Sequence, residues 1–170
     1  MEQGKYSALV VSTSFSSRTD RPRRLLEDNG VEIIWRPGPF NDEELSQLVA
    51  GHDALIVGID EVGEKTAGRA DKLRVIAKNG VGVDNIYVPA ATEKGIVVTR
   101  AIGSNTVSVA EFTFSLILSV TKNLVKAANA TKAGIWSGSK FSGTELADKT
   151  LGIIGLGRIG KRVAQDGLGF

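Results

Sequence analysis

Three glycines near the end of the 170-residue chain have the spacing of a dinucleotide-binding turn. The apolar run Leu151 to Ile154 leads into Gly155, Gly157 and Gly160, and Lys161 to Gln165 favours a helix. In such a turn the first glycine makes the tight bend, the second lets the backbone approach a pyrophosphate, and the third lets the helix pack on the strand. The free N–H groups and the dipole at the helix start then hold the phosphates. A glycine-rich turn that only packs a strand against a helix is the alternative.

A second glycine-rich turn follows an apolar, β-branched run in the middle of the chain. Asn79, Gly80, Val81 and Gly82 come directly after Lys78. Ligands of doubly wound folds bind at the carboxyl ends of parallel strands, and exposed backbone amides suit a carboxylate or a phosphate. Lys78 adds a positive charge there. Taken by itself, the turn is equally compatible with an ordinary connection from a strand to a helix.

Three further features are weaker candidates. The hydroxyl-rich stretch Ser12 to Ser17 is similar to the phosphate loop of flavodoxins but lacks its glycine, so a loop that caps the following helix is favoured. Four nearby arginines indicate an anion site or, more simply, a solvated helix face: Arg18, Arg21, Arg23 and Arg24. The one histidine, His52, follows Gly51 at a predicted helix end, and we expect it at the surface. We find neither metal-ligand spacing nor a nucleophile elbow.

Strand-like and helix-like segments alternate over the first 101 residues of the chain. Five short apolar runs predict strands: Tyr6 to Val11, Val31 to Trp35, Ala54 to Gly58, Leu73 to Ala77 and Ile96 to Thr99. Their continuous apolarity indicates strands covered on both faces. Helices are predicted from Arg21 to Asn29, from Asn41 to Gly51 and from Val88 to Gly95. This order predicts a doubly wound, mostly parallel α/β sheet over residues 1–101, and the family resemblance described below implies that this sheet is flavodoxin-like.

The chain changes character after Arg100. Residues 107–125 are apolar at nearly every helical azimuth, which predicts a helix buried between two domains or two subunits. Asn105 or Thr106 begins this helix, or a capping box does so at Ser108 to Glu111. Residues 131–150 predict an irregular arm, and Leu151 to Ile154 a sixth strand. Residues 102–170 therefore comprise the interdomain helix, the arm and the first βα unit of an incomplete Rossmann NAD-binding domain.

Composition excludes several classes of site and partner. The chain has no cysteine, so disulfides, thiolate metal ligands and a cysteine nucleophile are excluded. Its 42% hydrophobic and 24% charged content is typical of a globular domain, and the net charge of +2 gives no signal for polyanion binding. The first residues lack signal-peptide features, and the longest apolar run is too short to span a bilayer. We therefore expect a soluble, cytoplasmic protein with no nucleic-acid, membrane or metal partner.

Several linked segments carry a family resemblance, and they occur in one fixed order: KLRVIAKNGVGVDNI, EKGIVVT, SNTVSVAEFTFSLILSV and GIWSGSKFSGTELADKTLGIIGLGRIG. In this order the chain resembles the D-isomer-specific 2-hydroxyacid dehydrogenases, and within them the 3-phosphoglycerate dehydrogenase branch. The resemblance is close over about residues 73–164. Over residues 1–72 it is a pattern of strands and helices only.

The resemblance implies an enzyme in which two lobes close over NAD and a small 2-hydroxy or 2-keto acid, with NADP not excluded. It implies the following substrate-binding residues: Lys78, Asn79, Gly80, Val81, Gly82 and Asn105. It implies the following cofactor-binding residues: Val81, Gly155, Gly157, Arg158, Ile159 and Gly160. Lys78 stands where the family commonly has arginine, and lysine lacks the bidentate fork. The branch further implies 3-phosphoglycerate or a related acid as substrate, and a homodimer formed through residues 102–160.

The residues that the family uses for acid–base chemistry do not occur at matching positions of these 170 residues. The resemblance implies a catalytic histidine, a glutamate and an arginine in the later part of the second lobe. We therefore expect no catalytic residue in this chain, which would be an amino-terminal portion and inactive by itself. Two alternatives stay open: a non-enzymatic flavodoxin-like binding module, and a structural partner of a full-length dehydrogenase.

Overall fold

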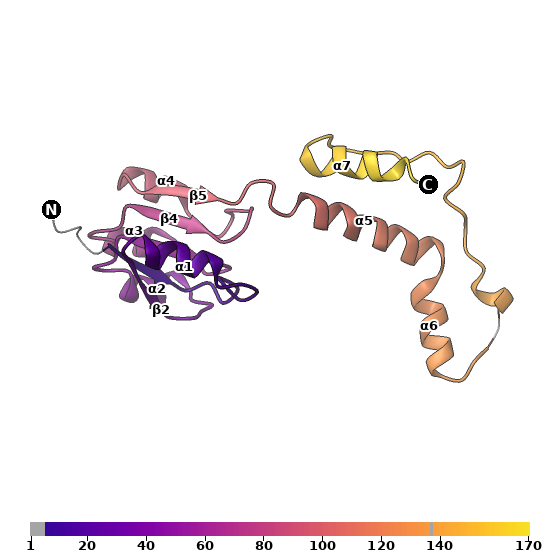
Figure 1. The fold of residues 1–170 in the computed structure, drawn as a ribbon, viewed down its shortest axis with the longest axis horizontal. Coiled ribbons are helices and arrows are strands. Elements are labelled where there is room, and N and C mark those ends of the chain that lie inside the picture. The colour runs from indigo at the N-terminus through magenta and orange to yellow at the C-terminus, as the bar shows by residue number, and fades with distance from the viewer. Residues whose placement is uncertain (1–5, 137) are drawn as a thin grey trace. The chain divides into compact units, whose positions relative to one another are not determined.

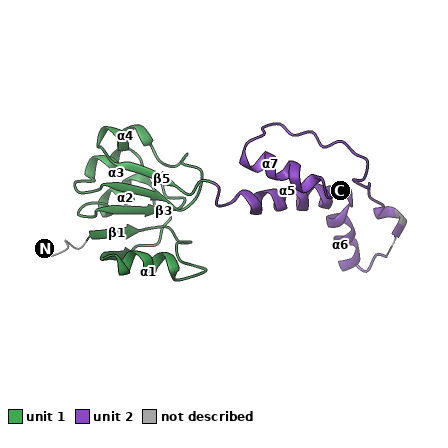
Figure 2. Ribbon diagram, turned by 45° about the horizontal axis from the view of Figure 1, so that its top comes forward, with its two compact units in different colours: residues 1–102 green, residues 103–170 purple. Residues whose placement is uncertain are grey.

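The computed structural model describes residues 6–136 and 138–170. The chain divides into two compact units, residues 1–102 and residues 103–170, each with its own hydrophobic core (Figure 2).

The first unit is built around a five-stranded sheet in which all strands are parallel (Figure 1). Its strands are β1 (Tyr6–Val10), β2 (Val31–Trp35), β3 (Ala54–Val57), β4 (Val75–Lys78) and β5 (Val97–Arg100). They lie in the order β2-β1-β3-β4-β5. This is the flavodoxin-like order, with the switch point between β1 and β3. The predicted doubly wound parallel sheet is confirmed, and each predicted strand lies within two residues of the observed one.

Four helices connect these strands: α1 (Arg21–Asp28), α2 (Asp42–Leu48), α3 (Glu64–Arg69) and α4 (Val88–Glu93). The sequence predicted α1, α2 and α4 but not α3. The central strands are the most deeply buried part of the unit, because helices cover both faces of the sheet. Leu9, Leu55 and Ile76 of β1, β3 and β4 are at most 1% exposed. Continuous apolar runs therefore form the centre of this sheet, as expected for parallel strands.

The helix ends follow local sequence signals in α2 and depart from them in α1. Asn41 accepts from the Glu44 N–H, and the Glu44 carboxylate accepts from the Asn41 N–H, which completes a capping box. In α1 the side chain of the preceding Asp20 caps none of the helix N–H groups. Instead the Ser16 hydroxyl accepts from the Arg23 N–H at 3.0 Å. The loop after β1 therefore caps α1.

Helix α3 is capped by a side chain that lies over twenty residues away in sequence. Its first residue follows Gly63, which has no side chain to offer as a cap. The Asp42 carboxylate accepts from the N–H groups of Gly63, Lys65 and Thr66, at 2.7, 3.1 and 3.0 Å. It also accepts from the Thr66 hydroxyl at 2.7 Å. The start of α2 thus holds the start of α3 in place.

The second unit contains α5 (Thr106–Thr121), α6 (Leu124–Lys132), a short 3-10 helix (Gly138–Phe141) and α7 (Arg158–Gly167). The helix predicted over residues 107–125 is therefore interrupted, because Asn123 adopts a left-handed conformation with φ of 52°. Of the two helix starts that stayed open, the structure has the one at Thr106, directly after Asn105, and not the capping box at Ser108 to Glu111. No helix among the described residues is long and apolar enough to cross a membrane.

The sixth strand predicted at Leu151 to Ile154 is wrong: this segment is extended without strand pairing. A strand needs hydrogen-bonding partners, and the described part of the second unit contains no other strand. Ile154 is fully exposed as a result. Of the predicted βα unit, the structure thus contains the turn and the helix only.

Helix α5 has two apolar faces. One packs on α7, where Ala110 and Phe114 contact Val163, and the Phe114 ring stacks on Phe170 at 5.0 Å between centroids. The other face is exposed along a ridge of i, i+4 positions: Phe112 is 62% exposed, Leu116 53% and Val120 77%. The all-round apolarity of the sequence therefore corresponds to one buried face and one open face.

Candidate functional site

The glycine turn after β4 presents a row of unpaired backbone donors at the carboxyl edge of the sheet. The Asn79 N–H donates to the Val57 carbonyl at 2.8 Å, and the Gly80 carbonyl accepts from the Ala101 N–H at 2.9 Å. These bonds fix both flanks of the turn. Within the described residues, the N–H groups of Gly80, Val81, Gly82 and Val83 donate to no protein acceptor. The turn is therefore held at both flanks and offers backbone donors that can receive an oxyanion.

Lys78 uses its ammonium within the protein. Its Nζ donates to the Gly58 carbonyl and, at 2.6 Å, to Asn85 Oδ1. The stem passes so close to Gly80 that a Cβ there would lie 3.3 Å from Lys78 Cε. The predicted substrate-binding charge thus also ties the end of β3 to the loop after β4.

Asn79 joins the turn to the serine-rich loop after β1. Its Nδ2 donates to the hydroxyls of Ser12 and Ser14, at 2.9 and 3.0 Å. Ser17 donates its hydroxyl to the Ser14 carbonyl, and Ser16 caps α1. Although this loop borders an open cavity of about 350 Å³, its hydroxyls already serve the fold. The geometry matches a capping loop rather than a free phosphate loop.

The arginine cluster and His52 are not part of the turn, although Arg18 lines the same open cavity as Asn79. Arg23 pairs with Glu27 at 2.9 Å and Arg24 with Asp20 at 3.9 Å, and all four side chains are exposed, as on a solvated helix face. His52 is half-buried rather than at the surface, because its Nδ1 lies 3.1 Å from the Ser7 hydroxyl. It precedes β3, so it lies at the amino edge of the parallel strands, opposite the glycine turn.

Asn85 and Asp60 stabilise the same edge, and neither was predicted as a site residue. The Asn85 amide donates to the carbonyls of Gly58 and Asp60. The buried Asp60 carboxylate accepts from the N–H groups of Phe40 and Gly58, both at 3.0 Å. Apart from the bond between Gly58 and Asp60, these contacts join loops that are twenty or more residues apart. Only the paired strands bring them together.

In the second unit, the glycine fingerprint has the geometry that each glycine requires. Gly155 has φ of 92°, a left-handed conformation that favours glycine. A Cβ at Gly160 would collide with the Gly155 carbonyl oxygen, whereas one at Gly157 would meet nothing within 4 Å. Helix α7 begins at Arg158 without a side-chain cap. The turn therefore leaves open space where a phosphate would approach the helix start.

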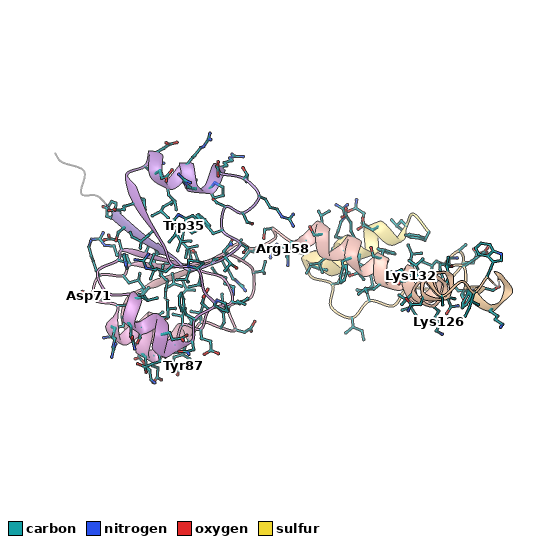
Figure 3. The ribbon with its side chains drawn as sticks, turned by 90° about the horizontal axis from the view of Figure 1, so that it is seen from below. Trp35, Asp71, Tyr87, Lys126, Lys132 and Arg158 are labelled. Carbon is teal, nitrogen blue, oxygen red and sulfur yellow. The ribbon has the colours of Figure 1, made fainter. Side chains whose placement is uncertain are left out.

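Arg158 and the start of α5 lie at the same end of the second unit. Helices α5 and α7 lie side by side (Figures 1 and 2). A Cβ on Gly103, just before α5, would lie 3.8 Å from Arg158 Cδ, and Phe114 packs near Gly167 at the other end. The two helices therefore run in the same direction, and Asn105 lies at the end where α7 begins. Arg158 is labelled in Figure 3, which draws the side chains as sticks. Ile159, also predicted to contact the cofactor, is 36% exposed in the first turn of α7.

Comparisons with known proteins agree with this architecture. A sequence model of the D-isomer specific 2-hydroxyacid dehydrogenase catalytic domain matches residues 10–156. The D-3-phosphoglycerate dehydrogenase of Methanocaldococcus jannaschii is 45% identical over 152 residues, which are 85% of this chain and 29% of that enzyme. The human D-3-phosphoglycerate dehydrogenase is 37% identical over 84% of this chain and 27% of that enzyme. The chain thus spans less than a third of these curated relatives.

Solved structures show the same similarity. The TT0316 protein from Thermus thermophilus has a TM-score of 0.85 and 33% identity over 96% of this chain and 53% of that one. The NAD⁺-bound 3-phosphoglycerate dehydrogenase of Entamoeba histolytica has a TM-score of 0.77 and 27% identity over 97% of this chain and 51% of that one. The resemblance read from the glycine turns and their linked motifs is confirmed, and the chain belongs to the D-isomer-specific 2-hydroxyacid dehydrogenase family.

Proposed function

We propose that this chain supplies the substrate lobe and the start of the cofactor lobe of an NAD-dependent oxidoreductase that acts on a 2-hydroxy acid. Residues 1–101 form the substrate-binding domain, and residues 102–170 the interdomain helix, the arm and the first part of the NAD-binding domain. The observation that carries the proposal is the row of unpaired N–H groups from Gly80 to Val83. Four donors on a turn with fixed flanks suit the carboxylate that every 2-hydroxy acid carries.

The fingerprint in the second unit is the proposed phosphate site of the cofactor. Gly155, Gly157 and Gly160 shape the turn, while Arg158 and Ile159 flank the pyrophosphate at the start of α7. Bound NAD would accept or donate a hydride at its nicotinamide. The uncapped α7 start and the open space at Gly157 support this assignment. NADP is the alternative cofactor.

The proposed substrate is 3-phosphoglycerate or a related 2-hydroxy acid, with Lys78, Asn79 and Asn105 beside it. The support comes from the curated relatives, several of which are D-3-phosphoglycerate dehydrogenases. We expect no turnover by these 170 residues alone. Acid–base chemistry needs a proton donor or acceptor within hydrogen-bond reach of the reacting atom. The family resemblance implies a histidine in this role, and His52 lies at the opposite edge of the sheet, beside Ser7.

We further propose that two copies associate through residues 102–160 and that the protein is cytoplasmic. The open face of α5 supports the first statement, since Phe112, Leu116 and Val120 are exposed along one ridge. Covering such a ridge removes apolar surface from water. A second copy offers the same ridge, as a two-fold interface requires.

Titration of the ¹⁵N-labelled chain with D-glycerate tests the carboxylate site. We expect saturable shifts of the Gly80, Val81, Gly82 and Val83 amide signals, while the His52 signals stay in place. A parallel titration with NAD should shift the Gly157 and Arg158 amides. Unmoved turn signals at saturating millimolar D-glycerate would refute the substrate site. Bound flavin, visible as absorbance of the purified chain, would instead favour a flavodoxin-like module.

A further inference from the structure

Arg100 is an exposed cation beside the glycine turn, and it is not among the predicted site residues. It is the last residue of β5, where the register pairs it with Lys78 of β4. Residues that pair across two strands project from the same face of the sheet. Its Nη1 donates to the Val81 carbonyl at 3.3 Å. The guanidinium therefore lies against the turn that presents the unpaired amides.

The positive charge of Lys78 is tied up, whereas most of the donors of Arg100 are not. Lys78 directs its ammonium to Gly58 and Asn85 inside the first unit. Arg100 makes one hydrogen bond, to Val81, and forms no ion pair with any residue that the structure describes. Since a guanidinium carries five N–H donors in a planar fork, four remain for an anion beyond the turn.

A carboxylate near the turn makes such a cation useful. A Cβ on Gly82 would lie 3.0 Å from Asp84 Oδ2, so a negative charge borders the unpaired amides. This charge opposes the binding of a substrate with two anionic groups more strongly than that of one with a single carboxylate. A second cation must offset it, and Arg100 is the exposed cation that the register places there.

We propose that Arg100 is the specificity-determining residue of the substrate lobe and binds a second anionic group of the substrate, a phosphate monoester or a distal carboxylate. The 2-carboxylate accepts hydrogen bonds from the Gly80 to Val83 amides, and the second anionic group accepts them from the free N–H groups of Arg100. The proposal rests on the proposed function, because it assumes that the turn holds the 2-carboxylate. It assigns to Arg100 the selection of dianionic acids over monocarboxylates.

The experiment compares dissociation constants of three acids for the 170-residue chain, read from the turn amides by NMR. D-Glycerate has one anionic group, D-malate adds a carboxylate and 3-phosphoglycerate adds a phosphate ester. We expect the wild-type chain to bind at least one of the two larger acids about tenfold more tightly than D-glycerate, as a charge-assisted pair allows. The preferred acid identifies which second group Arg100 accepts.

Two variants of Arg100 and one matched control separate charge from structure. R100Q keeps a donor for the Val81 carbonyl but loses the charge, and should reduce the preference to about twofold or less. R100K keeps the charge but not the fork, and should retain an intermediate preference. Arg36 is an exposed arginine directly after the last residue of β2. Like Arg100, it donates to a backbone carbonyl, that of Trp35, at 3.0 Å. R36Q should therefore keep the wild-type preference.

Each outcome assigns the failure to one statement. If D-glycerate shifts the turn amides but the wild-type chain shows no preference, or R100Q keeps the preference, the role of Arg100 is refuted and the carboxylate site stands. An equal loss in R36Q and R100Q would also refute it, since net charge alone would then explain the effect. If none of the three acids shifts the turn amides, the proposed function fails and the role of Arg100 fails with it.

Discussion

Replacement of Asp42 by alanine should destabilise the first unit through a helix that does not contain Asp42. The carboxylate accepts four hydrogen bonds at the start of α3, three from backbone N–H groups and one from the Thr66 hydroxyl. In D42A the Thr66 hydroxyl keeps the residue 42 carbonyl as an acceptor, which lies 3.2 Å away in the wild-type structure, and the exposed Lys65 N–H can bind water. The Gly63 and Thr66 N–H groups, in a part-buried setting, lose their acceptor.

The expected cost of D42A is about 2 to 3 kcal/mol in the free energy of unfolding, since each unsatisfied donor costs 1 kcal/mol or more and a lost cap costs a similar amount. This corresponds to a fall of roughly 15 °C in the melting temperature of a domain of this size. D42N should cost less, because its Oδ1 can still accept from Gly63 and Thr66. Glu43, next in the chain, makes exposed side-chain contacts with Lys65 and Gln47. E43A is therefore the matched control and should change stability little.

The pH dependence gives a second readout of the same contacts. Burial alone would raise the pKa of Asp42, but the hydroxyl of Thr66 and the N–H groups of Thr66, Gly63 and Lys65 outweigh it and hold the pKa below its ordinary value. A depressed folded-state pKa stabilises the fold above the unfolded-state pKa, and this stabilisation is lost as the pH falls through the folded-state pKa. The wild-type advantage over D42N should therefore shrink in strong acid. Urea unfolding followed by circular dichroism measures all three variants, and a D42A effect no larger than that of E43A would refute the reasoning.

Three further predictions concern other contacts. The Ser7 N–H and the Lys72 ammonium lower the pKa of Asp53. D53N should therefore destabilise the chain near neutral pH, and this destabilisation should disappear in strong acid. The same urea unfolding measures it, and a destabilisation that persists unchanged in acid would contradict the prediction. G160A should unfold α7, because the new Cβ would meet the Gly155 carbonyl. G157A should leave the helix intact and weaken the NMR shifts that NAD induces. Equal circular dichroism spectra of the two variants would contradict the packing argument. L116E should dissociate any dimer, because it places a charge on the open ridge of α5. Light scattering of L116E and of the wild-type chain checks this. If the wild-type chain is a dimer and L116E has the same mass, the prediction is wrong.

Local sequence signals were sufficient wherever a residue acts on its near neighbours. The β-branched runs predicted all five strands, Asn41 and Glu44 predicted a helix start, and the fingerprint glycines predicted a turn with one strained position and one with no room for a side chain. Each of these depends on backbone sterics or on hydrogen bonds between residues a few positions apart. The family motifs likewise lie in continuous stretches.

The tertiary structure decided which side chains serve the site and which serve the fold. Lys78, Asn79 and Asp42 all bind groups that are distant in sequence: Gly58, Ser12 and the start of α3. No periodicity or spacing encodes these pairs, because the parallel strands create them by bringing several strand ends to one edge. The failed strand at Leu151 to Ile154 has the same cause, since a strand forms only where another strand accepts its hydrogen bonds. Propensity is a property of the segment, whereas pairing is a property of the whole fold.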